Sequence, residues 1–130
     1  MINCGGLHAD KVANELMKDQ VYKLYFTKGH YYSYTGAPLV SSLTYPVPDP
    51  HLRSLGLHTT LDLGGSMKLG PDAHYIDEND DYSFPSDDTE LKRKFFDTVS
   101  RYLPSLQLDK LQRGYVGIRP KLAGPGEPFR

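Results

Sequence analysis

The chain has no tryptophan, a single cysteine and almost no net charge, and the last two of these shortages each exclude a class of protein. Cys4 alone cannot build an internal disulfide framework. A formal net charge of −1 lacks the basic face that nucleic-acid binding needs, so we expect no nucleic-acid partner. No apolar run approaches the length of a transmembrane helix, and the N-terminus has neither the basic start nor the apolar core of a signal peptide. The 130 residues are enough for one domain with a modest core.

The first segment has the order strand, glycine turn, helix. Residues 1–4 are predicted to end a buried strand, and Gly5 and Gly6 to form a tight turn. Residues 7–18 predict an amphipathic helix, because their apolar residues recur at helical spacing. This is half of a βα unit with no strand before it. We therefore interpret it as an orphan piece and expect the chain to be truncated.

The remaining sequence predicts a sheet with few helices. Strand-like composition bounded by turn residues occurs in five stretches: 23–34, 43–47, 55–63, 66–70 and 116–122. Gly29 is expected to mark a bend or bulge, and Gly64-Gly65 to turn a hairpin. Pro120 makes the last strand an edge or an interrupted one, because proline cannot donate to a strand ladder.

One longer helix is predicted after an exposed acidic loop at 77–81. Ser86 or Asp87 is expected to cap it, with Glu90 completing a capping box, and Pro104 to end it. Its apolar stripe consists of Leu91, Phe95, Val99, Tyr102 and Leu103. A second short helix is predicted near 108–112.

Five stretches along the chain carry a family resemblance: 2–10, 28–32 (KGHYY), 45–48 (YPVP) with 55–60 (LGLHTT), 65–72, and 117–121 (GIRPK) with 124–126. Together they resemble the D-amino-acid-oxidase-like superfamily of FAD-dependent oxidoreductases, and within it the L-2-hydroxyglutarate dehydrogenases and their bacterial relatives. The resemblance implies an α+β fold with a mixed, mainly antiparallel substrate-domain sheet and flanking helices. Residues 1–20 would be a remnant of the Rossmann-like FAD-binding domain, 21–114 the substrate-binding domain, and 115–130 a return strand towards the flavin.

The same resemblance implies a function and leaves alternatives open. The family function would be oxidation of an L-2-hydroxy acid by hydride transfer to FAD, with the electrons passing to an unidentified acceptor. The Gly-x-Gly-x-x-Gly turn that holds the FAD pyrophosphate is absent from the sequence, so we expect the isolated chain to be inactive. The alternatives are a non-catalytic remnant that associates through an exposed flavin-side surface, and an amino-acid or amine oxidase or glycerol-3-phosphate-dehydrogenase-like flavoenzyme. Relatives of this type are mitochondrial in eukaryotes, and a bacterial form would be cytoplasmic.

Arg119 is the candidate carboxylate anchor, because a guanidinium forms bidentate hydrogen bonds with a carboxylate. An interface salt bridge is its alternative role. Lys121 would share a face with Arg119 and reach a second carboxylate, or be a solvated lysine. His58 is the candidate general base, since an imidazole titrates near working pH, although a lone histidine on a strand is more often structural. Thr60 and Tyr45 are candidate substrate-binding residues.

Two further tyrosines, Tyr31 and Tyr32, would line the pocket or cover the flavin, or would belong to the core with a solvated tip. The resemblance assigns four residues at the strand end to FAD contact: Asn3, Cys4, Gly5 and Gly6. Cys4 is expected to be a small buried thiol. The histidines at 8, 30, 51, 58 and 74 are scattered without ligand spacing, and the acidic run lacks the pattern of a calcium loop, so no metal is expected.

Overall fold

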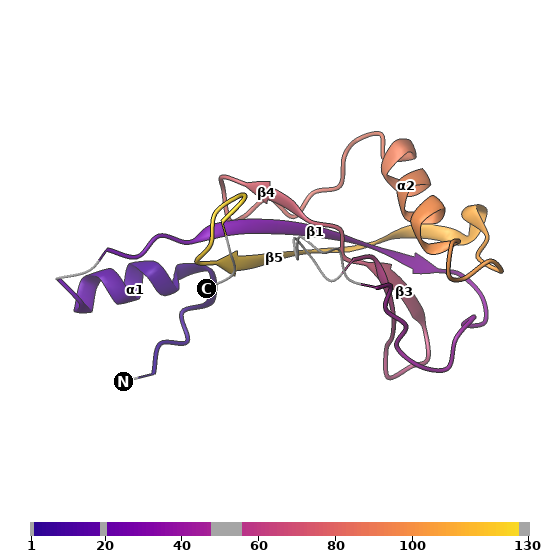
Figure 1. Ribbon diagram of the computed structural model, residues 1–130, viewed down its shortest axis with the longest axis horizontal. Helices are drawn as coiled ribbons and strands as arrows, with labels where there is room; N and C mark the ends of the chain where they lie inside the picture. Colours follow the sequence, from indigo (N-terminus) through magenta and orange to yellow (C-terminus); the bar gives the residue numbers. More distant parts are fainter. Residues whose placement is uncertain (1, 19–20, 48–55, 128–130) are drawn as a thin grey trace.

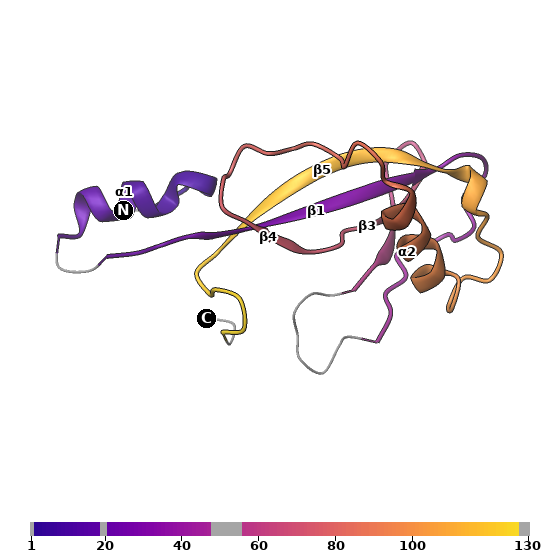
Figure 2. The same cartoon turned by 90° about the horizontal axis from the view of Figure 1, so that it is seen from above.

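The computed structural model describes residues 2–18, 21–47 and 56–127 and is organised around one long antiparallel strand pair, β1 and β5 (Figures 1 and 2). The elements in chain order are η1 (Gly6–His8), α1 (Ala9–Leu16), β1 (Tyr25–Tyr34), β2 (His58–Leu61), β3 (Met67–Gly70), β4 (His74–Ile76), α2 (Thr89–Val99), η2 (Leu108–Lys110) and β5 (Leu111–Lys121). Every pairing between these strands is antiparallel. The predicted α+β class with a mainly antiparallel sheet is confirmed.

β1 is the central strand. β5 pairs along one of its edges from Tyr25↔Lys121 to Tyr34↔Leu111. β3 and β4 share the other edge, β3 near the end of β1 and β4 near its start, and β2 lies outside β3. Because strand side chains alternate, odd-numbered residues at the start of β1 lie on one face and even-numbered ones on the other.

Between β3 and β4 the chain crosses close to Gly29. The Gly70–Pro71 peptide is cis. A Cβ at position 29 would lie 2.7 Å from the Pro71 Cβ and 3.0 Å from the Asp72 carbonyl oxygen, so only glycine fits without displacement. The ladder irregularity follows immediately, between His30 and Tyr32.

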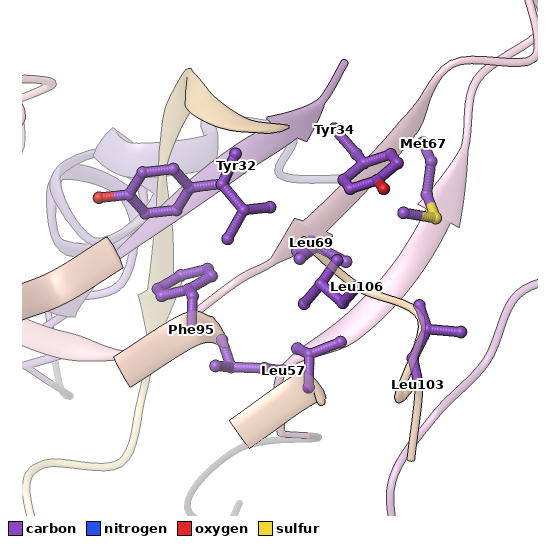
Figure 3. Close-up of a cluster of buried hydrophobic side chains, with 10 residues drawn as sticks. Tyr32, Tyr34, Leu57, Met67, Leu69, Phe95, Leu103 and Leu106 are labelled. Atoms are coloured by element: carbon purple, nitrogen blue, oxygen red, sulfur yellow. The ribbon is translucent and has the colours of Figure 1, made fainter. Parts of the chain in front are cut away.

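The core lies at the α2 end of the sheet, where the helix covers the even-numbered face of β1 (Figures 1 and 3). Its members are Tyr32, Tyr34, Leu57, Met67, Leu69, Phe95, Val99, Leu103, Leu106 and Leu111. Tyr32 packs edge-on against Phe95 with ring centroids 4.8 Å apart. The predicted helix stripe is confirmed, since Phe95, Val99 and Leu103 are all buried.

α1 lies apart from this core, at the far end of the molecule (Figure 2). None of its residues is buried, and Val12 and Leu16 are 37% and 56% exposed. The apolar side chains of α1 are therefore open to solvent, while self-association through a flavin-side surface stays a prediction.

Several element predictions need correction. Residues 2–5 form no strand, because no described strand lies beside them. The predicted strand at 43–47 is reduced to a single bridge, Thr44↔Thr59, and the stretch near 108–112 is one 3₁₀ turn that leads straight into β5. β4 was not predicted. The predictions for 48–55 lie outside the described residues.

The start and end of α2 also differ from the expectation. Asp88 is the N-cap residue, and its side chain makes no capping bond because it binds Tyr32 and Arg113 instead. Asp87, two residues before the first residue of α2, accepts hydrogen bonds from the Thr89 backbone N–H and hydroxyl. α2 ends at Val99, before the predicted Pro104.

Candidate functional site

A cavity of about 340 Å³ opens on the odd-numbered face of the β1–β5 pair. Its lining residues are Thr27, Gly29, Tyr31, Tyr45, His58, Pro71, Asp72, Ala73, Tyr115, Gly117, Ile118, Arg119 and Lys121. Gly117 lies directly opposite Gly29 and contributes bare backbone to the floor, whereas Pro71 covers Gly29. The cavity is at the small end of the range for ligand sites.

Two positively charged side chains of β5, Arg119 and Lys121, line the cavity. Arg119 and Lys121 are alternate residues of β5 and therefore project to the same face. Neither takes part in an ion pair within the described ranges. Partial burial lowers the pKa of Lys121, and the neighbouring charge of Arg119 lowers it further. Two like charges held together in this way favour an anion between them.

His58 lines the same cavity from β2, which lies beyond the edge of β1 opposite β5, and is only 8% exposed. Its Nδ1 is 3.0 Å from the Gly56 carbonyl oxygen, which can only accept, so Nδ1 carries the proton. Nε2 of the neutral ring is then the basic atom. Tyr45 stacks on the imidazole with centroids 4.4 Å apart and holds its plane.

A stacked tyrosine pair, Tyr31 and Tyr115, forms an aromatic wall with centroids 4.3 Å apart and an interplanar angle of 18°. Burial raises the pKa of Tyr31 to about 12, and the neighbouring Tyr115 phenol adds to the shift. The Tyr31 hydroxyl therefore stays protonated at neutral pH and can donate a hydrogen bond.

Thr27 is a pocket residue that the sequence reasoning missed. It lies opposite Arg119 in the ladder and is 7% exposed. Its Oγ1 is buried and has no hydrogen-bond partner in the described part of the chain. Its place two residues before Gly29, on the same strand face, was the only sequence signal.

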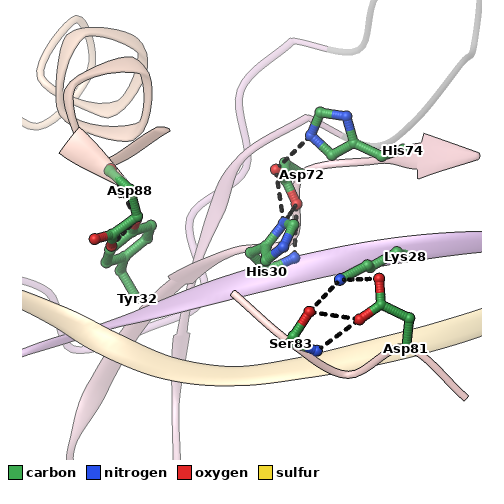
Figure 4. A network of polar contacts seen from close by, with 8 residues as sticks. All are labelled: Lys28, His30, Tyr32, Asp72, His74, Asp81, Ser83 and Asp88. Carbon is green, nitrogen blue, oxygen red and sulfur yellow. Dashed lines mark hydrogen bonds and ion pairs between the residues drawn. The ribbon is translucent and has the colours of Figure 1, made fainter. Parts of the chain in front are cut away.

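The opposite, even-numbered face carries a buried polar cluster around Asp72 (Figure 4). The Asp72 carboxylate accepts from the His30 backbone N–H at 2.6 Å, from His30 Nδ1 at 3.0 Å and from His74 Nε2 at 2.7 Å. The fold thus brings together two of the histidines that are scattered in the sequence. One ring nitrogen of His30, one of His74 and one carboxylate oxygen of Asp72 all lie within 4.8 Å of one another. Three N–H donors already satisfy the carboxylate, so the cluster works as a hydrogen-bonded clasp that fixes the 71–73 segment beside the cavity.

Next to this clasp, Lys28 is almost fully buried. Its Nζ is 2.8 Å from the Asp81 carboxylate and 3.5 Å from the Ser83 hydroxyl. The acidic loop is exposed as predicted at Asp77 and Asp80, but Asp81 pairs with a buried lysine instead of being merely solvated.

The structure brings together most, but not all, of the predicted site residues. Around the cavity lie Arg119, Lys121, His58, Tyr45 and Tyr31. Thr60 is on the same strand as His58 but does not line the cavity, and Tyr32 belongs to the core.

The predicted FAD contacts at residues 3–6 also lie outside the cavity. Asn3 closes a local turn instead, accepting from the Gly5 N–H and donating to the Ala9 carbonyl. Cys4 is exposed, which corrects the expectation of a buried thiol; no described strand lies beside it to cover it.

No helix in the described residues is long and apolar enough to cross a membrane.

Comparison with known proteins gives consistent matches. The profile of the DAO family, described as FAD dependent oxidoreductase, matches residues 1–129. The mitochondrial L-2-hydroxyglutarate dehydrogenase of Arabidopsis thaliana is 35% identical over 96% of this chain, which spans 28% of that protein. The L-2-hydroxyglutarate dehydrogenase of Escherichia coli K12 is 28% identical over 96% of the chain and 37% of its own length. The chain therefore spans about a third of the length of these relatives.

Among solved structures, the fold resembles that of the dithionite-reduced L-alpha-glycerophosphate oxidase of Mycoplasma pneumoniae with FAD bound. The TM-score is 0.72 at 20% identity, over 96% of this chain and 32% of that one. At this identity the likeness concerns the fold alone.

Proposed function

Because the chain belongs to the DAO family of FAD-dependent oxidoreductases, we propose that its cavity is the substrate-side wall of a site that oxidises an L-2-hydroxy acid. The observation that carries this proposal is that Arg119 and Lys121, neither of which forms an ion pair with another described residue, line the same cavity as His58. A 2-hydroxy dicarboxylate has complementary groups for all three. The proposal concerns the complete site, of which this chain holds one wall.

The cavity residues fit such a substrate together with the reactive end of the cofactor. The guanidinium of Arg119 binds the carboxylate next to the reacting carbon in bidentate fashion, and Lys121 binds the distal one. The bare backbone at Gly117, where a Cβ would have no heavy atom within 4 Å, leaves room for a flat ring system to approach, with Ile118 beside it. Gly117 and Ile118 are the residues that would hold the flavin ring. FAD, when bound, supplies the acceptor for the hydride.

His58 performs the proton chemistry in this proposal. The Gly56 carbonyl fixes the Nδ1–H tautomer, which leaves the Nε2 lone pair to take the proton of the substrate hydroxyl. Tyr45 keeps the ring plane in place. Tyr31 also lines the cavity and can donate a hydrogen bond to the substrate. Its phenol stays protonated, so it does not compete with His58 for the proton of the substrate hydroxyl.

The test is a binding measurement on the 130-residue chain. L-2-Hydroxyglutarate is titrated into wild type, Arg119→Gln and the control Arg93→Gln, an exposed arginine on α2, and binding is followed by calorimetry. We expect Arg119→Gln to weaken binding at least tenfold, as is typical for a lost bidentate charge-assisted contact, and the control to bind like wild type. Equal affinity of the Arg119 variant and wild type would refute the anchor.

A second series separates the rival functions. Two cations also suit a phosphate monoester, so glycerol 3-phosphate is used as a competitor; tighter binding of it than of the hydroxy acid would favour the glycerophosphate branch. FAD is then added with L-2-hydroxyglutarate and an artificial electron acceptor. Turnover that His58→Gln abolishes supports the enzyme, whereas substrate binding without turnover supports a non-catalytic chain.

A further inference from the structure

We propose that the Thr27 hydroxyl is a binding residue of this site, donating a third hydrogen bond to the carboxylate that Arg119 anchors. The inference rests on the proposed function and adds one determinant of carboxylate recognition. It starts from an unsatisfied group. Thr27 Oγ1 is enclosed in the wall of the cavity without a hydrogen-bond partner in the described ranges, although nearly all buried polar groups in proteins have one.

The position of Thr27 defines which ligand group it meets. Thr27 and Arg119 are directly paired across β1 and β5, so their side chains leave the sheet as neighbours on the same face. Lys121 is the diagonal neighbour, paired with Tyr25 two residues away. The Thr27 side chain therefore lies directly beside Arg119 and diagonal to Lys121, next to the place where the Arg119-bound carboxylate would be held.

The enclosed hydroxyl can reach this ligand by turning about one bond. Thr27 carries a methyl group and a hydroxyl on the same Cβ, and the staggered rotamers of χ1 exchange their positions. The hydroxyl breaks no hydrogen bond to any described residue in turning. A carboxylate oxygen beside Arg119 would supply the missing acceptor, so the rotation becomes favourable only when ligand is present.

This arrangement predicts opposite effects on stability and on binding. Replacing Thr27 by valine keeps the shape and removes an unsatisfied buried hydroxyl, which should stabilise the ligand-free protein. The same change removes a charge-assisted hydrogen bond from the complex. A residue with a purely structural hydroxyl would behave in the opposite way and lose stability on substitution.

The experiment compares wild type, Thr27→Val, Thr27→Ser and the control Thr98→Val, a half-buried threonine of α2 outside the cavity. Melting temperature is measured without ligand, and affinity is measured for L-2-hydroxyglutarate and for glutarate, which lacks the hydroxyl. We expect Thr27→Val to melt about 3 °C higher and to bind both acids roughly tenfold more weakly. Thr27→Ser should bind within about threefold of wild type, because it retains the hydroxyl, and Thr98→Val should change neither affinity.

Each other outcome overturns the inference. If Thr27→Val melts lower, the hydroxyl has a structural role. If it binds both acids as tightly as wild type while Arg119→Gln loses binding, the anchor stands and the Thr27 contact does not exist. If only L-2-hydroxyglutarate binding falls, Thr27 contacts the substrate hydroxyl and not the carboxylate. If wild type binds neither acid, the proposed function fails and the inference with it.

Discussion

The Tyr32 hydroxyl donates a 2.6 Å hydrogen bond to the Asp88 carboxylate and so joins the central strand to the start of α2 (Figure 4). The other carboxylate oxygen of Asp88 is 2.7 Å from an Arg113 nitrogen of β5. The Tyr32 side chain is fully buried, and burial together with this bond raises its phenol pKa. One acidic residue thus connects both long strands to the helix that covers the core.

Removing this hydroxyl should destabilise the fold. Tyr32→Phe leaves Asp88 without one of its donors, and we expect the free energy of unfolding to fall by about 1–2 kcal/mol. Tyr34→Phe is the control, because Tyr34 is equally part of the core but its hydroxyl makes no hydrogen bond in the described part of the chain; we expect a change of less than about 0.5 kcal/mol. Urea unfolding of both variants measures the difference, and equal losses would show that the Tyr32–Asp88 bond contributes nothing specific.

Stability should fall at acid pH because of the same carboxylate. The Arg113 contact, opposed by desolvation and assisted by Tyr32, lowers the pKa of Asp88 below its ordinary value of 3.8. The stabilisation is therefore complete above about pH 4 and is lost as the pH falls through the lower, folded-state pKa. Denaturant unfolding between pH 6 and pH 2 should show a shallower acid loss in Asp88→Asn than in wild type. Parallel curves would mean that other carboxylates cause the acid sensitivity.

Alanine substitutions at Gly29 and at Gly117 should differ in their effect on stability, and each serves as the control for the other. They face each other in the β1–β5 ladder, yet a Cβ at Gly29 would meet Pro71 at 2.7 Å, whereas a Cβ at Gly117 would have no heavy atom within 4 Å. Gly29→Ala should lower the free energy of unfolding by about 1–3 kcal/mol, the usual range for overpacking. Gly117→Ala should leave stability unchanged or slightly higher. Similar effects of the two substitutions would argue against the close crossing of the 71–73 segment.

Removing only the acidic partner of the Lys28–Asp81 ion pair should cost more stability than replacing both partners. The Lys28 side chain is 8% exposed and that of Asp81 is 47% exposed. Asp81→Ala leaves the Lys28 ammonium with only the Ser83 hydroxyl, at 3.5 Å, as a partner among the described residues, and we expect the free energy of unfolding to fall. Adding Lys28→Met should recover much of that loss, because an apolar side chain of similar length needs no partner. A double variant less stable than Asp81→Ala would contradict this account.

The sequence predicted those parts of the fold that local patterns determine. Apolar spacing located the α1 and α2 helices, and alternation with Gly64-Gly65 located the β2–β3 hairpin. β4 was not predicted, because it is only three residues long and is defined by its pairing with β1 and not by a local sequence pattern. The early start of β5 was missed for the same reason: residues 112–115 are exposed and lack an apolar pattern, but they have β1 beside them.

The candidate site was predictable only where chemistry marks a residue by type. Arg119, Lys121 and His58 could be proposed because they lie in stretches that carry the family resemblance and their side chains suit anion binding or proton transfer. Thr27 could not, since a threonine in a strand is ordinary and its significance lies in a missing partner. The Asp72 clasp could not be foreseen either, because its two histidines come from strands 44 residues apart in the sequence, at His30 and His74.

The alternation of side chains along β1 has a consequence for insertions and deletions. Thr27 and Tyr31 face the cavity, whereas the neighbouring Lys28 and Tyr32 face the buried cluster and the core. A one-residue insertion just after Lys28 would reverse the alternation of the preceding residues relative to the rest of the strand, turning the buried lysine towards the cavity and Thr27 towards the opposite face. Point substitutions in β1 damage one face at a time, but a single-codon insertion or deletion would exchange them, so this strand should tolerate changes of identity far better than changes of length.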